Sequence, residues 1–465
     1  MSNSYAPSRP APAFQNAELA KLSRQTYDLA TLEAVRQSLV SHGTLSLRRY
    51  SSGGSSAVTV LDLDRTLESA IDGLLINQWD RDAIMQALAE LAVALDAPLG
   101  AGLGIKPDAW KEGLRSCLVH HVNHQHRFLD IISGRVSGFE MGRRPHIRYN
   151  PLNLGESTES WGHGQNDSLG FISYLLFFAL NRGYLTWSEV EQLANPFACL
   201  QHHYFWTVHV WEDWELGAWE DKRAEHASSI AVVAASLREQ LEFVRKHGRL
   251  VYCTEGKCYD VTEAGVADML SRCESKLREL LPNEFIRSDN GEVRTVDSAI
   301  VNALLQAALS GKPLVDDGMT MQVISNIEQN LMGHIGISRY PRDVWDGRVN
   351  RRDLGNREEA QWCHVSPMLS YVLGEMYRRT GKQEHLDHQV YHFNRSLAHV
   401  NERWRIPEAY IVDATTRQWV SDANEPLAWA QAMTLLAIAG MKASLTHRDA
   451  VAAASIKQAS HSPSA

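Results

Sequence analysis

A carboxylate beside an indole is the group in this chain best placed to exchange a proton. Glu220 follows Trp219 at the end of a glycine-containing turn, and apolar residues recur at steps of three and four over the segment 222–246 that follows. An apolar wall disfavours the charged form of a carboxylic acid and raises its pKa, which would keep Glu220 protonated and able to donate. The same position also suits a first-turn acid that complements a helix dipole, or a surface acid without a role. These three interpretations stay open at this point.

Polar and aromatic residues gather in the turns that precede predicted helices. A shared crevice at one end of the helices would explain this concentration, because binding residues lie mostly on loops held by a rigid scaffold. Structural interpretations stand beside it. Arg81 and Asp82 suit an ion pair at a helix start, and Asp167 suits a helix cap. Arg339 could tie its loop to a nearby acid. The turns are 78–83 (QWDRDA), 161–167 (WGHGQND), 216–221 (LGAWED), 336–343 (GISRYPRD) and 405–410 (RIPEAY).

One group of histidines invites a metal interpretation. His120 and His124 lie four residues apart, on one face of a helix, with His121 and His126 nearby. No carboxylate or cysteine stands at a helpful spacing from them. Polar histidines with partners inside the protein are therefore the better interpretation, and we expect neither a metal nor a cofactor.

The composition is ordinary for a globular protein. Hydrophobic residues make up 44% and charged residues 22% of the 465 residues, and the net charge is −9. This charge argues against nucleic acid or an anionic membrane as the main partner. Thirteen tryptophans suit sugar binding, since flat indoles stack on the apolar faces of pyranose rings, although large helical cores also use tryptophan.

Several features favour a reducing cytoplasm. The N-terminal residues contain no apolar run of the kind that secretory signals carry. The longest apolar stretch, 426–441, includes Gln431 and Thr434 and is short for a membrane span. The six cysteines are too sparse for a disulfide framework, and a zinc site built on Cys253 and Cys258, which flank a predicted hairpin turn, would need a second pair.

The pattern predicts an all-α protein with about twelve helical segments. The segments 169–180 and 427–441 are apolar nearly all round, as in helices buried on every side, whereas 384–401 carries a one-sided stripe. A two-layer helical barrel would show this alternation, and so would an irregular all-α bundle. Two short runs, 44–49 and 57–63, predict a small β-hairpin near the N-terminus. Other helix candidates include 65–75, 80–96 and 222–246.

We expect one domain over residues 18–445. The flanking segments 1–17 and 446–465 are rich in Pro, Ser or Ala or otherwise lack an apolar pattern, and we expect them to be disordered.

With these turns in hand, the chain resembles the family-15 glycoside hydrolases, the glucoamylases, and the homologous domain of phosphorylase kinase regulatory subunits. The similarity runs from about residue 75 to about residue 440. Residues 79–82 resemble the family's Trp-x-Arg-Asp, and 161–167 match its Trp-Gly-x-x-Gln-x-Asp. Residues 217–220 resemble the Gly/Asp-x-Trp-Glu that holds the general acid, and 336–343 resemble Gly-Arg-Tyr-Pro-x-Asp.

The resemblance implies an (α/α)6 barrel, of the six-hairpin glycosidase type, with its site at one mouth. It makes Glu220 the general acid and Glu408 the general base. The family's base often stands in a Ser-Glu-Glu-like context, whereas Glu408 lies in Ile-Pro-Glu-Ala-Tyr, so Glu425 is a competitor for this role.

The resemblance also implies a set of substrate-binding residues. Arg81 and Asp82 would bind hydroxyls of the terminal glucose, and Arg339 would contact the sugar with its forked donors. Trp161 would shape the site beside the acid. The remaining residues that we expect at the substrate are Gln165, Asp167, Trp219 and Trp362.

Three functions are consistent with these observations. The first is an inverting, exo-acting α-glucosidase that releases glucose from an α-glucan, a maltooligosaccharide or trehalose, with two carboxyl groups about 6.5–9.5 Å apart. The second is a non-catalytic, carbohydrate-sensing regulatory protein like the kinase subunit domain. The third is a helical scaffold without a sugar site, which leaves the clustered motifs unexplained. A homo-oligomer is compatible with each of them.

Overall fold

The computed structural model describes residues 9–58, 76–157, 159–343, 345, 358–413 and 415–460, and is mostly helical. Within these residues, six helices form an inner ring in which each helix packs against the next and the last packs back against the first. The ring helices are α4 (Asp80–Leu95), α8 (Asn166–Asn181), α10 (Ala227–His247), α12 (Val301–Ser310), α14 (Val365–Thr380) and α16 (Ala428–Ser460).

The outer layer alternates with the ring along the sequence. Within the described residues it contains α2 (Leu29–Ser41), α6 (Ala109–Asn123), α9 (Trp187–Val208), α11 (Glu263–Leu280), α13 (Asp317–Asn330) and α15 (Gln383–Ala398). Shorter helices and 3-10 turns connect these layers: α1 (Ala17–Leu22), α5 (Ala97–Gly100), α7 (His126–Ile132), η2 (Met141–Arg143) and η3 (Ser298–Ile300). The architecture is therefore the predicted two-layer (α/α)6 barrel.

The two kinds of predicted helix occupy the two layers as expected. In the ring helix α8, every residue from Asn166 to Leu180 is buried, because neighbours surround it on all sides. In the outer helix α15, the buried residues include the predicted apolar stripe. The apolar pattern therefore separated inner from outer helices correctly.

Short antiparallel strand pairs join the loops at one end of the barrel. In the first pair, β1 (Gln78–Trp79) lies against β2 (Arg148–Tyr149), with Trp79 opposite Arg148. A three-stranded sheet contains β5 (Gln361–Trp362), β6 (Ala409–Val412) and β7 (Trp419–Ser421), with Trp362 opposite Ala409. Ile337 adds an isolated bridge to Trp362. These pairings bring loops that are distant in sequence to one mouth.

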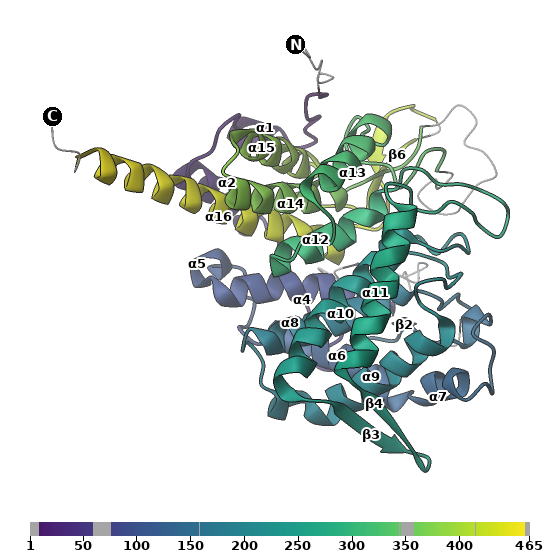
Figure 1. Cartoon of the computed structure of the whole chain (residues 1–465). Coiled ribbons are helices and arrows are strands. Elements are labelled where there is room, and N and C mark those ends of the chain that lie inside the picture. The colour runs from purple at the N-terminus through teal and green to yellow at the C-terminus, as the bar shows by residue number, and fades with distance from the viewer. Residues whose placement is uncertain are drawn as a thin grey trace.

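A separate hairpin projects from the barrel and consists of β3 (Leu250–Thr254) and β4 (Lys257–Val261) (Figure 1). The hairpin turn predicted between Cys253 and Cys258 is confirmed. These two cysteines lie opposite each other and form a disulfide, which the small number of cysteines in the chain did not suggest.

The hairpin predicted near the N-terminus differs from the structure. Residues 44–49 contain no strand, and of the second run only Ala57 and Val58 are described, the rest lying outside the described residues. Instead, the backbone carbonyls of Thr44 and Arg48 accept hydrogen bonds from the side chains of Gln431 and Gln86. The segment thus packs on ring helices and is not paired with a strand. The helix predicted at 65–75 also falls outside the described residues.

The predicted ends of the domain differ as well. Asn16 caps α1 and its amide donates to the carbonyl of Asn401, and Tyr391 donates to the carbonyl of Pro10, so residues from about 10 onward lie on the barrel. At the other end, α16 continues past residue 445 to Ser460 and extends beyond the other helices (Figure 1). Across the described ranges, no helix combines the length and the apolar character that crossing a membrane would require.

The bridge between Ile337 and Trp362 leaves no room for a side chain at Gly336. An added Cβ would lie 2.6 Å from the carbonyl oxygen of Trp362, and both segments would have to move apart. We expect Gly336→Ala to lower the free energy of unfolding by about 1–3 kcal/mol, as overpacking does. Chemical denaturation measures this loss. Gly318→Ala in α13 is the matched control, because its Cβ would meet only the end of the Asp316 side chain, and equal losses in both variants would contradict the proposed close contact.

Candidate active site

Glu220 lies in the loop between α9 and α10, at the mouth where the strand pairs meet. Glu215 and Ala224 exchange backbone hydrogen bonds and close the base of this loop, and Leu216 donates to the carbonyl of Gly164. Glu220 itself has a φ of 58°, in the left-handed region. Since α10 begins only at Ala227, and not at residue 222 as predicted, Glu220 does not occupy the first turn of a helix. This excludes the helix-dipole interpretation.

The surroundings of Glu220 favour its protonated form. Burial raises the pKa of this carboxyl from 4.5 to about 7, the nearby charge of Arg81 and a hydrogen bond with Gln165 lower it, and the charges of Asp82 and Asp167 raise it. The indole Nε1 of Trp79 donates to Glu220 Oε1 at 3.1 Å. The indole that hydrogen-bonds to Glu220 is thus that of Trp79, and not that of the adjacent Trp219.

Arg81 connects the three segments that surround Glu220. Its Nε donates to Asp167 Oδ2 at 2.9 Å, one terminal nitrogen donates to the carbonyl of Ala218 at 2.8 Å, and the other donates to Gln165 Oε1 at 2.7 Å. The side chain is buried. Arg81 therefore pairs with Asp167 and not with the adjacent Asp82, and most of its donors are engaged inside the protein.

Asp167 and Gln165 take positioning roles in this arrangement. Asp167 is buried in the first turn of α8 and binds Arg81, so the interpretation of Asp167 as a helix cap is wrong. Gln165 accepts from Arg81 and also contacts Glu220. The expected contacts of these two residues with sugar stay predictions, because their described partners are protein groups.

An aromatic wall stands next to the acid. The rings of Trp79 and Trp161 meet edge to face with centroids 6.1 Å apart. The guanidinium of Arg148 lies 5.0 Å from the Trp79 centroid and 4.3 Å from that of Trp161, and one of its terminal nitrogens pairs with Glu159. Stacked cations and rings of this kind hold one another in place. Trp161 is partly exposed at this wall, where we expected it to shape the site.

A second aromatic group surrounds Arg339. The Arg339 guanidinium lies 5.1 Å from the ring centroid of Trp362 and 5.6 Å from that of Trp219, whose centroids are 5.5 Å apart. Two of its nitrogens form a fork on the carboxylate of Asp343, four residues on in the same loop. The interpretation that Arg339 ties its loop to an acid is therefore confirmed. A contact with sugar stays a prediction.

Glu408 lies directly before β6, in the same region of the mouth. Its backbone NH donates to the carbonyl of Asn424, and the Asn424 amide donates to Glu408 Oε2 at 2.6 Å. Burial raises the pKa of Asp82 to about 7, with the Arg81 charge opposing this shift and the Glu408 charge adding to it. Asp82 thus lies within electrostatic reach of both Glu408 and Glu220, which brings the proposed acid and base to one mouth.

Glu425 is held differently. Its carboxylate accepts from the amide of Asn401 at 2.7 Å, pairs with Arg403 and lies 3.8 Å from Arg405. These partners engage it in an ion-pair network, and the choice between Glu408 and Glu425 as the base stays a prediction.

Some residues of the site were not predicted. Trp79 belongs to the motif at residues 79–82, but the sequence did not indicate its contact with Glu220. In the structure Trp79 lies in β1, which pairs with β2, and its indole donates to Glu220. His364 is buried, stacks on Trp429 with centroids 4.0 Å apart, and lies 6.0 Å from the Trp219 centroid. The guanidinium of Arg81 lies 5.9 Å from the Trp429 ring. His364 thus connects Trp429 to the Trp219 ring, and no local sequence signal links these residues.

The histidines that invited a metal interpretation have protein partners. The two ring nitrogens of His120 lie 2.9 Å from the carbonyl oxygens of Leu154 and His146. His121 Nε2 lies 2.8 Å from Asp80 Oδ2, and His124 Nδ1 lies 2.7 Å from the His120 carbonyl. They hold the α6 region to neighbouring loops.

Comparison with known families decides what kind of barrel this is. The family model of the glycosyl hydrolases family 15 matches residues 76–439. The chain belongs to glycosyl hydrolase family 15. The match spans the mouth from Trp79 to Trp429, so the site described above lies entirely within it. A comparison with curated proteins finds no match.

Solved structures show the same fold. Glucoamylase from Saccharomycopsis fibuligera superposes with a TM-score of 0.61 at 14% identity, over 91% of this chain and 97% of that chain. A glycosidase variant in complex with glucose gives a TM-score of 0.62 at 14% identity, covering 92% and 98%. Family 15 glucoamylase from Hypocrea jecorina gives 0.57 at 13% identity, covering 89% and 73%. The regulatory alternative is not favoured by these matches.

The raised pKa of Glu220 should lower the stability of this family 15 protein at neutral pH. Glu220 has a pKa of about 7 when folded and near 4.5 when unfolded, so the unfolded chain releases its proton first and stability falls as pH rises between these values. Because glutamine cannot ionise, we expect Glu220→Gln to be more stable than wild type at pH 8, by on the order of 2 kcal/mol, and equally stable at pH 4. Denaturant unfolding at both pH values measures this.

Asp221 supplies the matched control for that comparison. Its carboxylate binds Arg294 at 3.0 Å, and although burial opposes the shift, the charge of Arg294 lowers its pKa. Asp221→Asn should therefore destabilise the protein at pH 8. A Glu220→Gln variant less stable than wild type at pH 8 would contradict the burial of an ionisable acid at this position.

Proposed function

We propose that this family 15 protein is an inverting, exo-acting α-glucoside hydrolase that releases glucose from the non-reducing end of an α-glucan or oligosaccharide. Glu220 is the general acid and Glu408 the general base. The observation that carries the proposal is that one carboxyl group at the mouth keeps its proton near neutral pH while a second carboxyl group lies in the same region. Glu220 holds its proton to about pH 7, in hydrogen-bond contact with Trp79, while Glu408 lies within electrostatic reach through Asp82.

The reaction needs only these groups and water. Glu220 transfers its proton to the glycosidic oxygen as the bond to the anomeric carbon breaks, and the shortened chain leaves with a free hydroxyl. A water molecule attacks the anomeric carbon from the opposite face, and Glu408 takes a proton from it. The product is β-glucose from an α-linked end. Solvent returns a proton to Glu220 and accepts one from Glu408, which restores the starting state.

The walls of the mouth suit a sugar ring. Trp161 on one side and Trp219 on the other have partly exposed rings, which pack against the buried rings of Trp79 and Trp362. Asp82 is partly exposed, so its carboxyl is a better candidate for binding sugar hydroxyls than the guanidinium of Arg81, whose donors are engaged inside the protein. Arg81 instead holds three segments in fixed positions relative to one another: the loop that carries Glu220, the segment that carries Asp167, and its own helix α4.

Substitution of the glutamates tests the assignment. We expect Glu220→Gln and Glu408→Gln each to lower kcat by about 10³-fold or more on α-1,4 and α-1,6 oligosaccharides and trehalose, because each removes one proton transfer. Glu425→Gln is the control and should keep most of its activity. Proton NMR of the digest reports glucose release and its anomer together. Early release of α-glucose, or a Glu425→Gln variant as inactive as Glu408→Gln, would overturn the assigned mechanism.

The pH profile tests the role of Asp82. Glu220 must be protonated to act, so kcat/KM should fall above about pH 7, and the negative charge of Asp82 contributes to that high value. Asp82→Asn should therefore move the alkaline limb to lower pH by roughly 0.5 unit or more, in addition to any increase in KM. Asp221→Asn, whose carboxylate is taken up by Arg294, should leave the limb in place. An unchanged limb in Asp82→Asn would show that Asp82 does not act on Glu220.

A further inference from the structure

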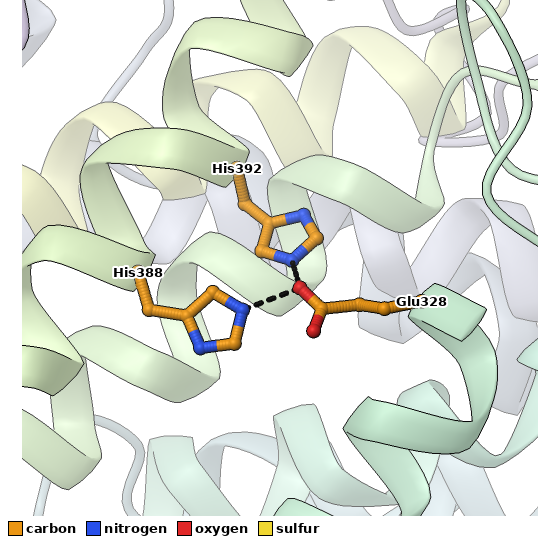
Figure 2. A group of neighbouring side chains, drawn as sticks. All are labelled: Glu328, His388 and His392. Atoms are coloured by element: carbon orange, nitrogen blue, oxygen red, sulfur yellow. Dashed lines mark hydrogen bonds and ion pairs between the residues drawn. The ribbon is translucent and has the colours of Figure 1, made fainter. Parts of the chain in front are cut away.

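A second cluster of titratable side chains lies in the outer layer, away from the mouth. Glu328 comes from α13, and His388 and His392 come from α15, where a spacing of four residues places both on one helix face (Figure 2). His388 and His392 are buried and Glu328 is partly buried. Figure 2 shows both imidazoles turned toward the same carboxylate. The proposed hydrolytic mechanism makes no use of this cluster.

The three side chains converge on a single point. His392 Nε2 lies 3.0 Å from Glu328 Oε1, and His388 Nε2 contacts the same oxygen. One candidate ligand atom from each side chain lies within 4.8 Å of the others. Two imidazole nitrogens and one carboxylate oxygen form the ligand set that zinc and neighbouring divalent transition metals take in proteins.

We propose that Glu328, His388 and His392 bind a divalent transition-metal ion of the zinc class, which links α13 to α15. The site is independent of the proposed hydrolysis. Bonds of about 2.0–2.1 Å arranged tetrahedrally separate neighbouring ligand atoms by about 3.3 Å. The present separation of 3.0 Å between His392 Nε2 and Glu328 Oε1 is therefore within a few tenths of an ångström of the distance that an ion requires.

Access to the site passes Arg9. Its Nε lies 3.3 Å from Glu328 Oε1, and its side chain is 42% exposed. The guanidinium also lies 5.5 Å from the centroid of the Tyr391 ring, and an ion would take its place on the carboxylate after it moves into solvent. Protein side chains would supply three ligands and water the fourth, as in zinc sites with an open position.

The position of the cluster gives the ion a structural role. Glu328 lies near the end of α13, and the loop that carries Arg339 begins directly after that helix. One turn beyond His392, Arg395 donates to the carbonyls of Gly333, Ile335 and Gly336 in the same loop. An ion at the cluster would fix the two helices at the base of this loop.

Metal titration of the apo-protein tests the proposal. After chelation and dialysis, Co²⁺ should bind at one site per chain and give the visible absorption of a tetrahedral nitrogen and oxygen site, and Zn²⁺ should displace it. Zn²⁺ at 100-fold excess over its Kd should raise Tm by about 2–3 °C for a chain of this length. Both signals should disappear in His388→Gln and in Glu328→Gln.

Two controls separate this site from other histidines. His385→Gln, on the same helix but outside the cluster, should keep the Co²⁺ spectrum and the rise in Tm. Circular dichroism and Tm without metal establish that the cluster variants fold. A wild-type protein that binds no Co²⁺ at 1 mM, or a spectrum that survives in folded His388→Gln, would overturn the proposal. Glucose release in the same samples is a separate readout, so a failed hydrolysis assay leaves this test intact.

Discussion

The buried guanidinium of Arg81 is the interaction on which the proposed site depends. It donates to Asp167 on α8, to Gln165 before that helix, and to the carbonyl of Ala218 in the acid loop, while its own backbone starts α4. A planar group with five fixed donors can bind three separate segments in one geometry, which a lysine could not. The segments that carry Glu220 and Asp82 are thereby held relative to each other without any direct contact between the two acids.

Placing carboxyl groups in this mouth disfavours their charged forms. Burial raises the pKa of Glu220 and of Asp82 to about 7. The charge of Asp82 adds to the shift of Glu220, and the charge of Glu408 adds to the shift of Asp82. Acids that serve only stability are paired with arginines, as Asp343 is with Arg339 and Asp221 with Arg294. The acids at the mouth therefore fall into two classes, those with a raised pKa and those paired with an arginine. Glu220 and Asp221 belong to different classes although they are adjacent in sequence. Glu220 and Asp82 share a single buried cation, whose attraction only partly offsets the loss of water, and this is how an acid is kept protonated near neutral pH.

The all-α class and the segments of the site could be read from local sequence, and the family resemblance gave the (α/α)6 barrel. The contacts within the site could not be read from the sequence. Continuous apolar runs such as 169–180 indicate ring helices, because a helix that is buried on every side has no face in contact with solvent. The start of α10 was predicted too early, since a loop closed by Glu215 and Ala224 has no periodicity of its own. The ion-pair partner of Arg81 also could not be predicted from the sequence. Its neighbour Asp82 is adjacent in sequence, but Asp167 is brought close only by the packing of α4 on α8.

The outer layer also sets the geometry of the mouth. Arg339 reaches the aromatic group formed by Trp219 and Trp362 from a loop that has little regular structure of its own. The carbonyls of this loop are held by Arg395, and His399 Nε2 lies 3.2 Å from the Ile335 carbonyl, both residues belonging to the outer helix α15 or its end. A buried arginine that donates to three carbonyls of this loop ties it to α15. Movement of α15 against α13 would therefore be transmitted to Arg339, which is why a link between these two helices matters to a site on the inner ring.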